Sequence, residues 1–414
     1  MYQDLALLGF FVFAYSLLAG RLSRTVISGP ILFTAFGLAV GPLGLGLVGY
    51  HAQWHDLKLL AELTLALVLF SDAANTNLAA LYSNIGIPRR LLLLGLPLTI
   101  ALGIAVGLGL FPQLGFLEVA LLATMLAPTD AALGKAVVTD ERVPAGVREG
   151  LNVESGLNDG ICVPILMVFL TLATTAAVAT DPLFLTVRLM TEEIGIGLVV
   201  GVGVTLIAGN LIWLAERRDW VTRSWRQLTV AALAVSCFAL AQELGGSGFI
   251  AAFTGGLMFG WLCGPIKKPL LLAADGTGDT MALITWVIFG TSVITLGIGD
   301  LSWQVVVYAL LSLTLIRMLP VFLSLYGLGL SMKTMLFLGW FGPRGLASIV
   351  FIVIVLNESS DNPLLAHGGT LAMTVVTTVI LSILAHGLSA NPLVARLGKQ
   401  LTEEHALSKI REKR

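Results

Sequence analysis

Residues Ala127 to Asp159 read APTDAALGKAVVTDERVPAGVREGLNVESGLND, and long apolar segments lie on both sides of this polar stretch. If both flanks cross a membrane, three carboxylates lie at or near bilayer depth: Asp130, Glu154 and Asp159. A charged group at the centre of a membrane helix costs at least ~2.5–3.5 kcal/mol, so such groups are usually functional. The stretch therefore predicts a buried polar site inside a membrane protein.

The composition is that of a polytopic membrane protein. Of 414 residues, 57% are hydrophobic and only 12% are charged, and the mean hydropathy is +0.92, whereas soluble domains carry about 25% charged residues. The net charge of −1 gives no footprint for nucleic acid. No phosphate-binding loop of the GxxxxGK[ST] type occurs, so we expect no nucleotide and no other cofactor. Three cysteines without CxxC spacing are expected to be buried thiols: Cys162, Cys237 and Cys263.

Long apolar segments predict an all-α fold with thirteen membrane-spanning helices. Their approximate ranges are 4–20, 28–48, 58–77, 91–111, 116–138, 148–175, 192–214, 227–244, 248–264, 277–298, 303–327, 332–356 and 369–390. Residues 181–191 are expected to form a short surface helix before the seventh span.

The Lys and Arg residues predict the orientation of these spans. With the N-terminus outside and the C-terminus inside, all but four of the 24 Lys and Arg residues fall on the inner side, as the positive-inside rule requires. The exceptions are Lys58, Arg188, Arg317 and Arg344. We therefore expect a multi-pass protein of the cell (inner) membrane with a short cytoplasmic tail at 391–414.

An internal repeat supports the same layout. Ser28-Gly29-Pro30-Ile31 is followed 219 residues later by Ser247-Gly248-Phe249-Ile250, and glycines recur after both at the same offset. Because these two spans should run in opposite directions, the similarity indicates an inverted-topology repeat within one transporter domain, residues 1–414. Repeat one is about 4–175, a linker helix about 182–214 and repeat two about 227–390.

The same offset pairs the fifth span with the twelfth, and both are interrupted near their middles. Pro128-Thr129-Asp130 interrupts one, and Gly342-Pro343-Arg344-Gly345 interrupts the other. We expect these two spans to be discontinuous helices that cross. Paired interruptions of this kind mark the binding site of many transporters. Unwinding leaves helix ends in the membrane, where Asp130 would compensate positive ends and Arg344 negative ones.

Charged residues from five spans should share one depth. Asp72, Asp130, Asp159, Arg317 and Arg344 each lie about 12 to 15 residues into their spans, near the middle of a ~30 Å core. We expect Asp72 either to ligate the ion or to be solvated in an inner funnel.

The sixth span presents two polar faces. Ser155 and Asp159 are four residues apart and can offer a hydroxyl and a carboxylate to a cation. Glu154 and Asn158 share the neighbouring face, and Glu154 is expected to pair with Arg317. With the Thr129 hydroxyl and freed backbone carbonyls, these oxygens predict a site for a small monovalent cation.

At this point a family resemblance is evident. The Thr129-Asp130 pair, the run Glu154-Ser155-x-x-Asn158-Asp159 and the segment Gly342–Gly345 resemble the monovalent cation:proton antiporters, in particular the NhaP-type sodium/proton antiporters and the animal sodium/hydrogen exchangers. The resemblance covers nearly the whole chain. It implies an inverted repeat of six spans, a linker span and six spans, a homodimer, and a core domain that moves against a dimerisation domain.

The resemblance also implies roles for individual residues. Asp159 would be the exchanging carboxylate, with Na+ held at Asp159, Ser155, Thr129 and the Asp130 backbone. Asn158 would position Asp159, and a Glu154–Arg317 pair would support the site. The chain departs from the family at three positions: Ala131 follows the Thr-Asp pair, Gly156 replaces a larger residue, and Asp72 stands where many members have a different acid or none. The coordination and selectivity of the ion therefore stay open.

The expected function is exchange of Na+ (or Li+) for H+ across the membrane, without enzymatic activity. Burial favours the protonated form of Asp159 and a bound cation favours the ionised form, so the two ions compete for one carboxylate. Asn158 does not titrate, which predicts electroneutral exchange of one cation for one proton.

Three alternatives remain open at this point. The first is K+/H+ exchange on the same scaffold, and a cation channel is more remote. An intramembrane aspartyl protease would use the GxGD string Gly297–Asp300, but no Tyr-Asp partner occurs in the chain.

Overall fold

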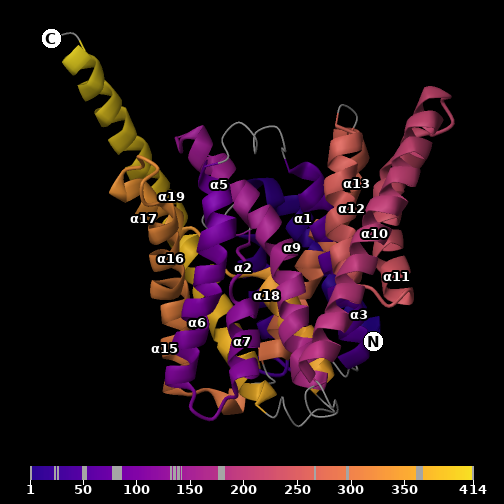
Figure 1. The fold of residues 1–414 in the computed structure, drawn as a ribbon, viewed down its shortest axis with the longest axis horizontal. Coiled ribbons are helices and arrows are strands. Elements are labelled where there is room, and N and C mark those ends of the chain that lie inside the picture. Colours follow the sequence, from indigo (N-terminus) through magenta and orange to yellow (C-terminus); the bar gives the residue numbers. More distant parts are fainter. Residues whose placement is uncertain are drawn as a thin grey trace.

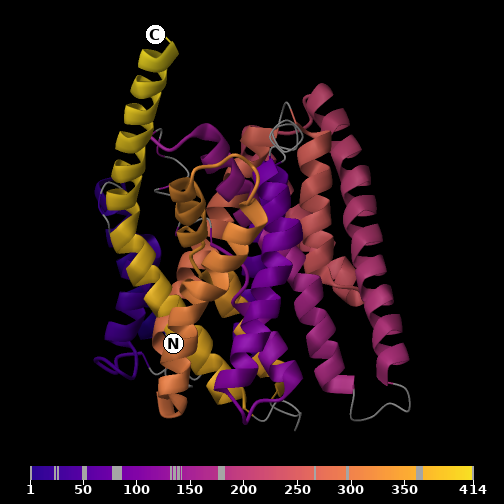
Figure 2. The same cartoon turned by 60° about the vertical axis from the view of Figure 1, so that its left-hand side comes forward.

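The computed structural model describes residues 2–22, 25, 28–48, 54–76, 86–130, 133, 137, 140, 142–175, 182–264, 267–294, 298–359 and 367–412. Within these residues all regular structure is helical, with no strand. Most helices run along one common direction, and the end of α19 projects beyond the others (Figures 1 and 2). Ala131, one of the departures from the family pattern, lies outside the described residues.

The helices have these bounds in chain order: α1 (Tyr2–Leu22), α2 (Gly29–Val40), α3 (Trp54–Asn75), α5 (Gly86–Arg90), the π-helix η1 (Leu91–Gly95), α6 (Leu96–Leu110), α7 (Phe116–Met125), α9 (Ala145–Thr175), α10 (Pro182–Arg217), α11 (Arg223–Glu243), α12 (Gly248–Leu262), α13 (Lys267–Ile288), the π-helix η2 (Phe289–Val293), the 3-10 helix η3 (Ile298–Asp300), α15 (Trp303–Leu313), α16 (Leu315–Leu325), α17 (Met332–Trp340), α18 (Leu346–Ser359) and α19 (Gly368–Glu412).

Helix occupies part of each of the thirteen predicted spans. Six segments among the described residues are both long enough and apolar enough to cross a membrane: Tyr2–Leu22, Gly86–Leu110, Ala145–Thr174, Thr191–Arg217, Trp303–Leu325 and Gly368–Leu397. The all-helical membrane fold is therefore present, whereas the count of thirteen crossings and the orientation stay predictions.

One predicted boundary is wrong. The expected surface helix at 181–191 is not separate, because α10 is continuous from Pro182 to Arg217. An i,i+4 ion pair between Arg188 and Glu192, at 2.9 Å, spans the predicted junction and favours continuity. The segment predicted as a cytoplasmic tail, 391–414, continues α19 as far as Glu412, and its place on the cytoplasmic side stays a prediction.

Two predicted spans are interrupted or shortened. The eleventh is divided at Thr314, whose backbone leaves the helical region (φ −114°, ψ −93°) between α15 and α16. The second ends at Val40, because Gly41 adopts an extended conformation and a turn follows, with Gly46 at a positive φ of 62°. Apolar side chains continue beyond both points, so hydropathy alone does not locate these ends.

The helices pack in two groups. α2, α3, α10, α11, α12 and α13 contact mainly one another, and α6, α7, α9 and α15 to α19 form the second group. The two groups meet chiefly where α18 and α9 contact α3 and where α10 contacts α9. In Figure 1, α10 to α12 and α15 to α17 lie at opposite sides of the molecule, with α9 and α18 between them.

Glycines at the repeat offset make equivalent close contacts. A Cβ at Gly37 of α2 would overlap the backbone oxygen of Val287 in α13, and a Cβ at Gly256 of α12 would overlap that of Phe70 in α3. Gly37 and Gly256 are 219 residues apart. Each half of the chain thus packs a small-residue helix against a long helix of the other half, as the predicted repeat would require.

Candidate functional site

The two interrupted helices touch at their breaks. α7 ends at Met125 and α17 ends at Trp340, and the residues that follow each, 126–130 and 341–345, are not helical. The backbone N–H of Asp130 donates to the carbonyl of Pro343 at 2.7 Å. Proline and glycine thus leave two stretches of irregular backbone in contact inside the protein, where their polar groups must find partners.

Asp130 caps the helix that follows the second break. Its Oδ2 accepts the backbone N–H of Leu346 in the first turn of α18, at 2.9 Å, and its Oδ1 accepts that of Leu133 at 3.2 Å. A carboxylate is favourable here because the helix N-terminus carries partial positive charge. Gly345 is required beside it, since a Cβ there would overlap the Asp130 carboxylate.

Arg344 lies near the C-terminal end of α17, and a helix C-terminus carries partial negative charge. Its side chain is fully buried, and its Nη1 donates to the carbonyl of Gly342, just beyond the end of α17, at 2.8 Å. Its backbone N–H donates to Ser382 Oγ at 2.7 Å. Asp130 and Arg344 therefore stand at ends of opposite polarity, as the sequence predicts from the two interruptions.

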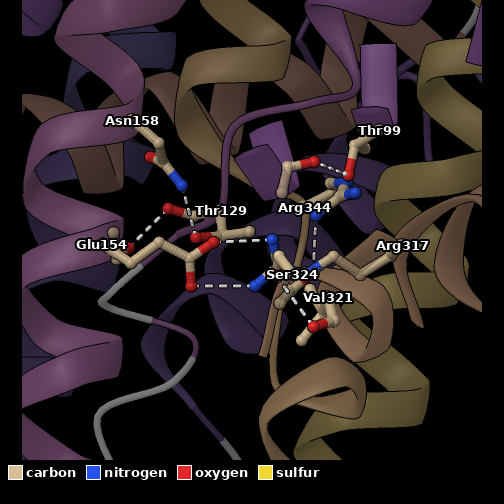
Figure 3. A network of polar contacts seen from close by, with 11 residues as sticks. Thr99, Thr129, Glu154, Asn158, Arg317, Val321, Ser324 and Arg344 are labelled. Atoms are coloured by element: carbon tan, nitrogen blue, oxygen red, sulfur yellow. Dashed lines mark hydrogen bonds and ion pairs between the residues drawn. The ribbon is translucent and has the colours of Figure 1, made fainter. Parts of the chain in front are cut away.

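Glu154 and Arg317 form a buried ion pair (Figure 3). Arg317 Nη1 and Nη2 donate to Glu154 Oε1 and Oε2 at 2.6 and 2.8 Å, and the two side chains are 1% and 2% exposed. This parallel arrangement is the strongest geometry for a guanidinium and a carboxylate. It joins α9 to α16 beside the breaks.

Thr129 is held from both polar faces of α9. Ser155 Oγ donates to the Thr129 carbonyl, and Asn158 Nδ2 donates to Thr129 Oγ1 at 2.7 Å. Figure 3 shows the Asn158 amide directed toward Thr129. The family resemblance implies instead that Asn158 positions Asp159, but no hydrogen bond joins these two side chains in the described structure. Asn158 fixes the Thr129 side of the site.

One carboxylate oxygen of Asp159 has no hydrogen-bond partner among the described residues. Its Oδ1 is buried and accepts no hydrogen bond from the described residues, and the same holds for Asn158 Oδ1. Buried oxygens of this kind are rare, because a desolvated acceptor without a donor is costly. Asp159 also lies within electrostatic range of Asp130 and Asp72, so a cation or a proton would relieve the local negative charge.

Asp72 lies across from Gly156, on the wall of a small cavity. This cavity has a volume of about 50 Å³ and is lined by Asp72, Asn75, Thr76, Asn152, Val153 and Gly156. Asn75 and Asn152 are exposed. A Cβ at Gly156 would lie 3.9 Å from Asp72 Cβ, so a small side chain would fit and a large one would fill the cavity.

A larger cleft lies at the other ends of the same helices. It has a volume of about 430 Å³, and its polar lining includes Lys58 and Glu62 of α3, Thr171 and Thr174 of α9, and Glu193 of α10. Asp72 and Gly156 belong to the opposite halves of α3 and α9. Asp159, in the middle of α9, therefore lies between the two hollows.

Comparison with known proteins agrees with this arrangement. Residues 7–396 match the family model described as "Sodium/hydrogen exchanger, transmembrane". The chain belongs to the sodium/hydrogen exchanger family. This is a family of multi-pass membrane antiporters and not of enzymes, which removes the aspartyl protease alternative; Asp300 of the GxGD string lies exposed in η3.

The exchanger is similar to curated antiporters. It is 28% identical to the Na+/H+ antiporter ApNhaP of Aphanothece halophytica over 391 residues, which cover 89% of this chain and 70% of that protein. It is 26% identical to the K+/H+ antiporter NhaP of Alkalimonas amylolytica over 411 residues, covering 95% and 67%. Because one relative is named for Na+ and the other for K+, these matches do not identify the cation.

A solved structure shows the same fold. The sodium proton antiporter MjNhaP1 of Methanocaldococcus jannaschii superposes with a TM-score of 0.75 at 21% identity, covering 96% of the exchanger and 99% of that chain. At this identity the likeness concerns the fold alone.

Ser382 and His386, which the sequence did not indicate, form hydrogen bonds with residues at the second break. His386 Nε2 lies 2.9 Å from the carbonyl of Trp340, the last residue of α17, and His386 Nδ1 lies 3.2 Å from Ser382 Oγ. Ser382 Oγ in turn accepts the N–H of Arg344. With its proton on Nε2, a neutral imidazole donates to the Trp340 carbonyl and can accept the Ser382 hydroxyl at Nδ1, which also lies 2.9 Å from the Ser382 carbonyl.

Replacing His386 tests whether its contacts with Trp340 and Ser382 hold the second break in place. His386→Leu removes the partner of the Ser382 hydroxyl and one of the two donors to the Trp340 carbonyl, which still accepts the Gly342 N–H. The loss of stability should be about 1 kcal/mol, and exchange should slow because the break is held less firmly. His386→Gln retains an N–H near the position of Nε2 and should recover most of the loss. Thermal melting and exchange rates of the two variants provide the measurement, and equal loss in both would show that the hydrogen bond to Trp340 is not what matters.

Proposed function

We propose that this exchanger carries one Na+ (or Li+) in exchange for one proton, and that Asp159 binds the two ions alternately. The observation that carries the proposal is the buried Oδ1 of Asp159, which accepts no hydrogen bond from the described residues. The Thr129 backbone and hydroxyl, Ser155 and Asn158 supply neighbouring oxygen atoms. Such hard oxygen ligands suit a small alkali cation.

The other acids near the breaks support the assignment by their partners. Glu154 is neutralised by Arg317, and each carboxylate oxygen of Asp130 accepts a backbone N–H, one from Leu346 at the start of α18 and one from Leu133. Asp130 therefore belongs to the site through its backbone and its charge rather than as a free ligand. Asp72 borders the small cavity, and we assign it to the approach of the ion.

The two hollows support alternating access. The cleft at Glu62 and Glu193 and the cavity at Asp72 and Gly156 lie toward opposite ends of α3 and α9. With the predicted orientation, the wider one faces outside. The helix group that contains α9, α17 and α18 would move against the group that contains α3 and α10. We assign the first group as the core domain and the second as the dimerisation domain of a homodimer.

Competition couples the two ions without a separate gate. Asp159 holds either a proton or a cation, so the loaded helix group has the same charge in both cases. Movement of the empty, charged form would carry an unpaired carboxylate through a low-dielectric region, which is strongly unfavourable. Only occupied forms therefore cross.

The identity of the cation has a direct test. Purified protein in proteoliposomes with an internal pH dye should show proton flux on addition of Na+ or Li+. The K+/H+ alternative is favoured by the name of one relative, and it would be supported if K+ alone drives the flux. Flux of cation without any dye response would instead indicate a channel and contradict the proposal.

Exchange is expected to be electroneutral. Asn158 carries no titratable proton, so one proton leaves Asp159 for each cation that arrives. The membrane potential, worth ~2.3 kcal/mol per charge per 100 mV, should then not move the balance point between the two gradients. An imposed potassium-diffusion potential with valinomycin, with Na+ as the exchanged ion, measures this. A voltage-dependent balance point would show that Asp130 or Asp72 carries a second proton.

A further inference from the structure

An apolar groove lies between α16, α17 and α19, separate from the ion site. It has a volume of about 360 Å³. The apolar side chains that line it are Met318, Leu336, Phe337, Trp340, Leu393 and Leu397. α16 packs against α17, and α19 passes beside both (Figure 2).

Two cations complete the lining. Lys333, in the first turn of α17, and Arg396, on α19, border the groove, and none of the described residues that line it is acidic. Both side chains are exposed, and neither forms an ion pair with a described residue. Under the predicted orientation, both belong to the inner side of the membrane.

The adjoining surface is apolar along one helix. Leu315, Leu319 and Leu323 of α16 are 45%, 40% and 55% exposed and lie four residues apart, so they form one stripe beside Met318. An occupant with an anionic head at Lys333 and Arg396 could extend a hydrocarbon chain along this stripe. A free anion would satisfy the two cations and leave the apolar groove unfilled.

We propose that this groove binds an anionic phospholipid of the inner leaflet, with its headgroup phosphate at Lys333 and Arg396 and an acyl chain against Trp340 and Leu336. Basic pockets between membrane helices on the cytoplasmic side recognise such headgroups, and each basic residue near the surface adds to the attraction. The chemistry does not depend on which cation the exchanger transports.

The lipid would also contact the second break. Trp340 lines the groove, its carbonyl is held by His386, and its Nε1 donates to Ser389 Oγ at 2.9 Å. A chain packed against Trp340 restrains the end of α17, which precedes the segment 341–345. Occupancy of the groove should therefore stabilise the protein and raise its exchange rate.

Lipid-dependent thermal stability provides the test. Full-length protein in neutral detergent is melted with added phosphatidylglycerol, with phosphatidylcholine of the same acyl chains, or with glycerol 3-phosphate. We expect phosphatidylglycerol alone to raise the melting temperature of the wild type. The double variant Lys333→Gln/Arg396→Gln should bind phosphatidylglycerol at least about tenfold more weakly. Native mass spectrometry measures this as the fraction of protein that retains a bound lipid. Leu336→Trp, which fills the groove and keeps both cations, should weaken binding as well.

A matched pair separates this site from general attraction to negative lipid. Arg21→Gln/Arg218→Gln removes two exposed cations from the same predicted face, away from the groove, and should leave the response at the wild-type level. Equal loss in both double variants would overturn the proposal in favour of diffuse attraction. A response to glycerol 3-phosphate equal to that of the lipid would also overturn it, in favour of a soluble anion.

Discussion

Asp159→Asn is expected to abolish cation-driven proton flux, to below a few per cent of wild type. The carboxamide neither takes up a proton nor balances a cation, so the alternation between two neutral loaded forms is lost. The fold should not suffer, because Asp159 Oδ1 has no described hydrogen-bond partner to lose. Removing an ionisable group from a buried position is, if anything, stabilising, so the melting temperature should stay the same or rise.

Asp219→Asn is the matched control. It makes the same chemical change in an exposed turn, where Asp219 has a positive φ of 52° that Asn tolerates equally well. This variant should exchange at the wild-type rate in the same proteoliposome assay. Flux in Asp159→Asn above a few per cent of the control would show that another carboxylate, Asp72 or Asp130, carries protons.

The parts of the site that the sequence predicts are those in which charge and backbone interruption coincide. A charge in an apolar span needs a partner, and Glu154 and Arg317 are of opposite sign at similar predicted depth. Pro and Gly locate both breaks, and the polarity of the exposed helix ends then assigns Asp130 and Arg344. These arguments need only the charge of a residue, its predicted depth in the membrane and the local effect of Pro or Gly on the helix.

The parts that the sequence does not predict depend on which way a side chain turns. Ser382 and His386 lie in a helix of small and apolar residues, and nothing in that pattern indicates contact with the end of α17, more than 40 residues earlier. Asn158 could reach either Asp159 or Thr129, and packing of the first break against α9 decides for Thr129. Helix ends such as Val40 and Thr314 are missed because the apolar character continues past them.

Breaking one half of the Glu154–Arg317 pair should cost ~3–5 kcal/mol of stability, since each single change leaves an uncompensated buried charge. Glu154→Gln leaves Arg317 beside the equally buried Arg344, whereas Arg317→Met leaves Glu154 with Arg344 still in electrostatic range. Glu154→Gln should therefore be the more harmful of the two. Met is chosen because it retains the volume of the arginine stem.

The double variant decides whether the two side chains act as a unit. Glu154→Gln/Arg317→Met buries no unpaired charge at this position, so its loss of stability should be clearly smaller than the sum of the single losses. Arg188→Met/Glu192→Gln is the control, because the Arg188 and Glu192 side chains are 63% and 49% exposed and water screens the pair. Thermal and chemical denaturation of all four proteins give the cycle. Strict additivity of the two losses would show that Glu154 and Arg317 do not interact.

Since neither residue ligates the ion in the proposed mechanism, the apparent affinity for Na+ should change far less than stability. A fall in affinity that matches the fall in stability would instead place the pair inside the ion site.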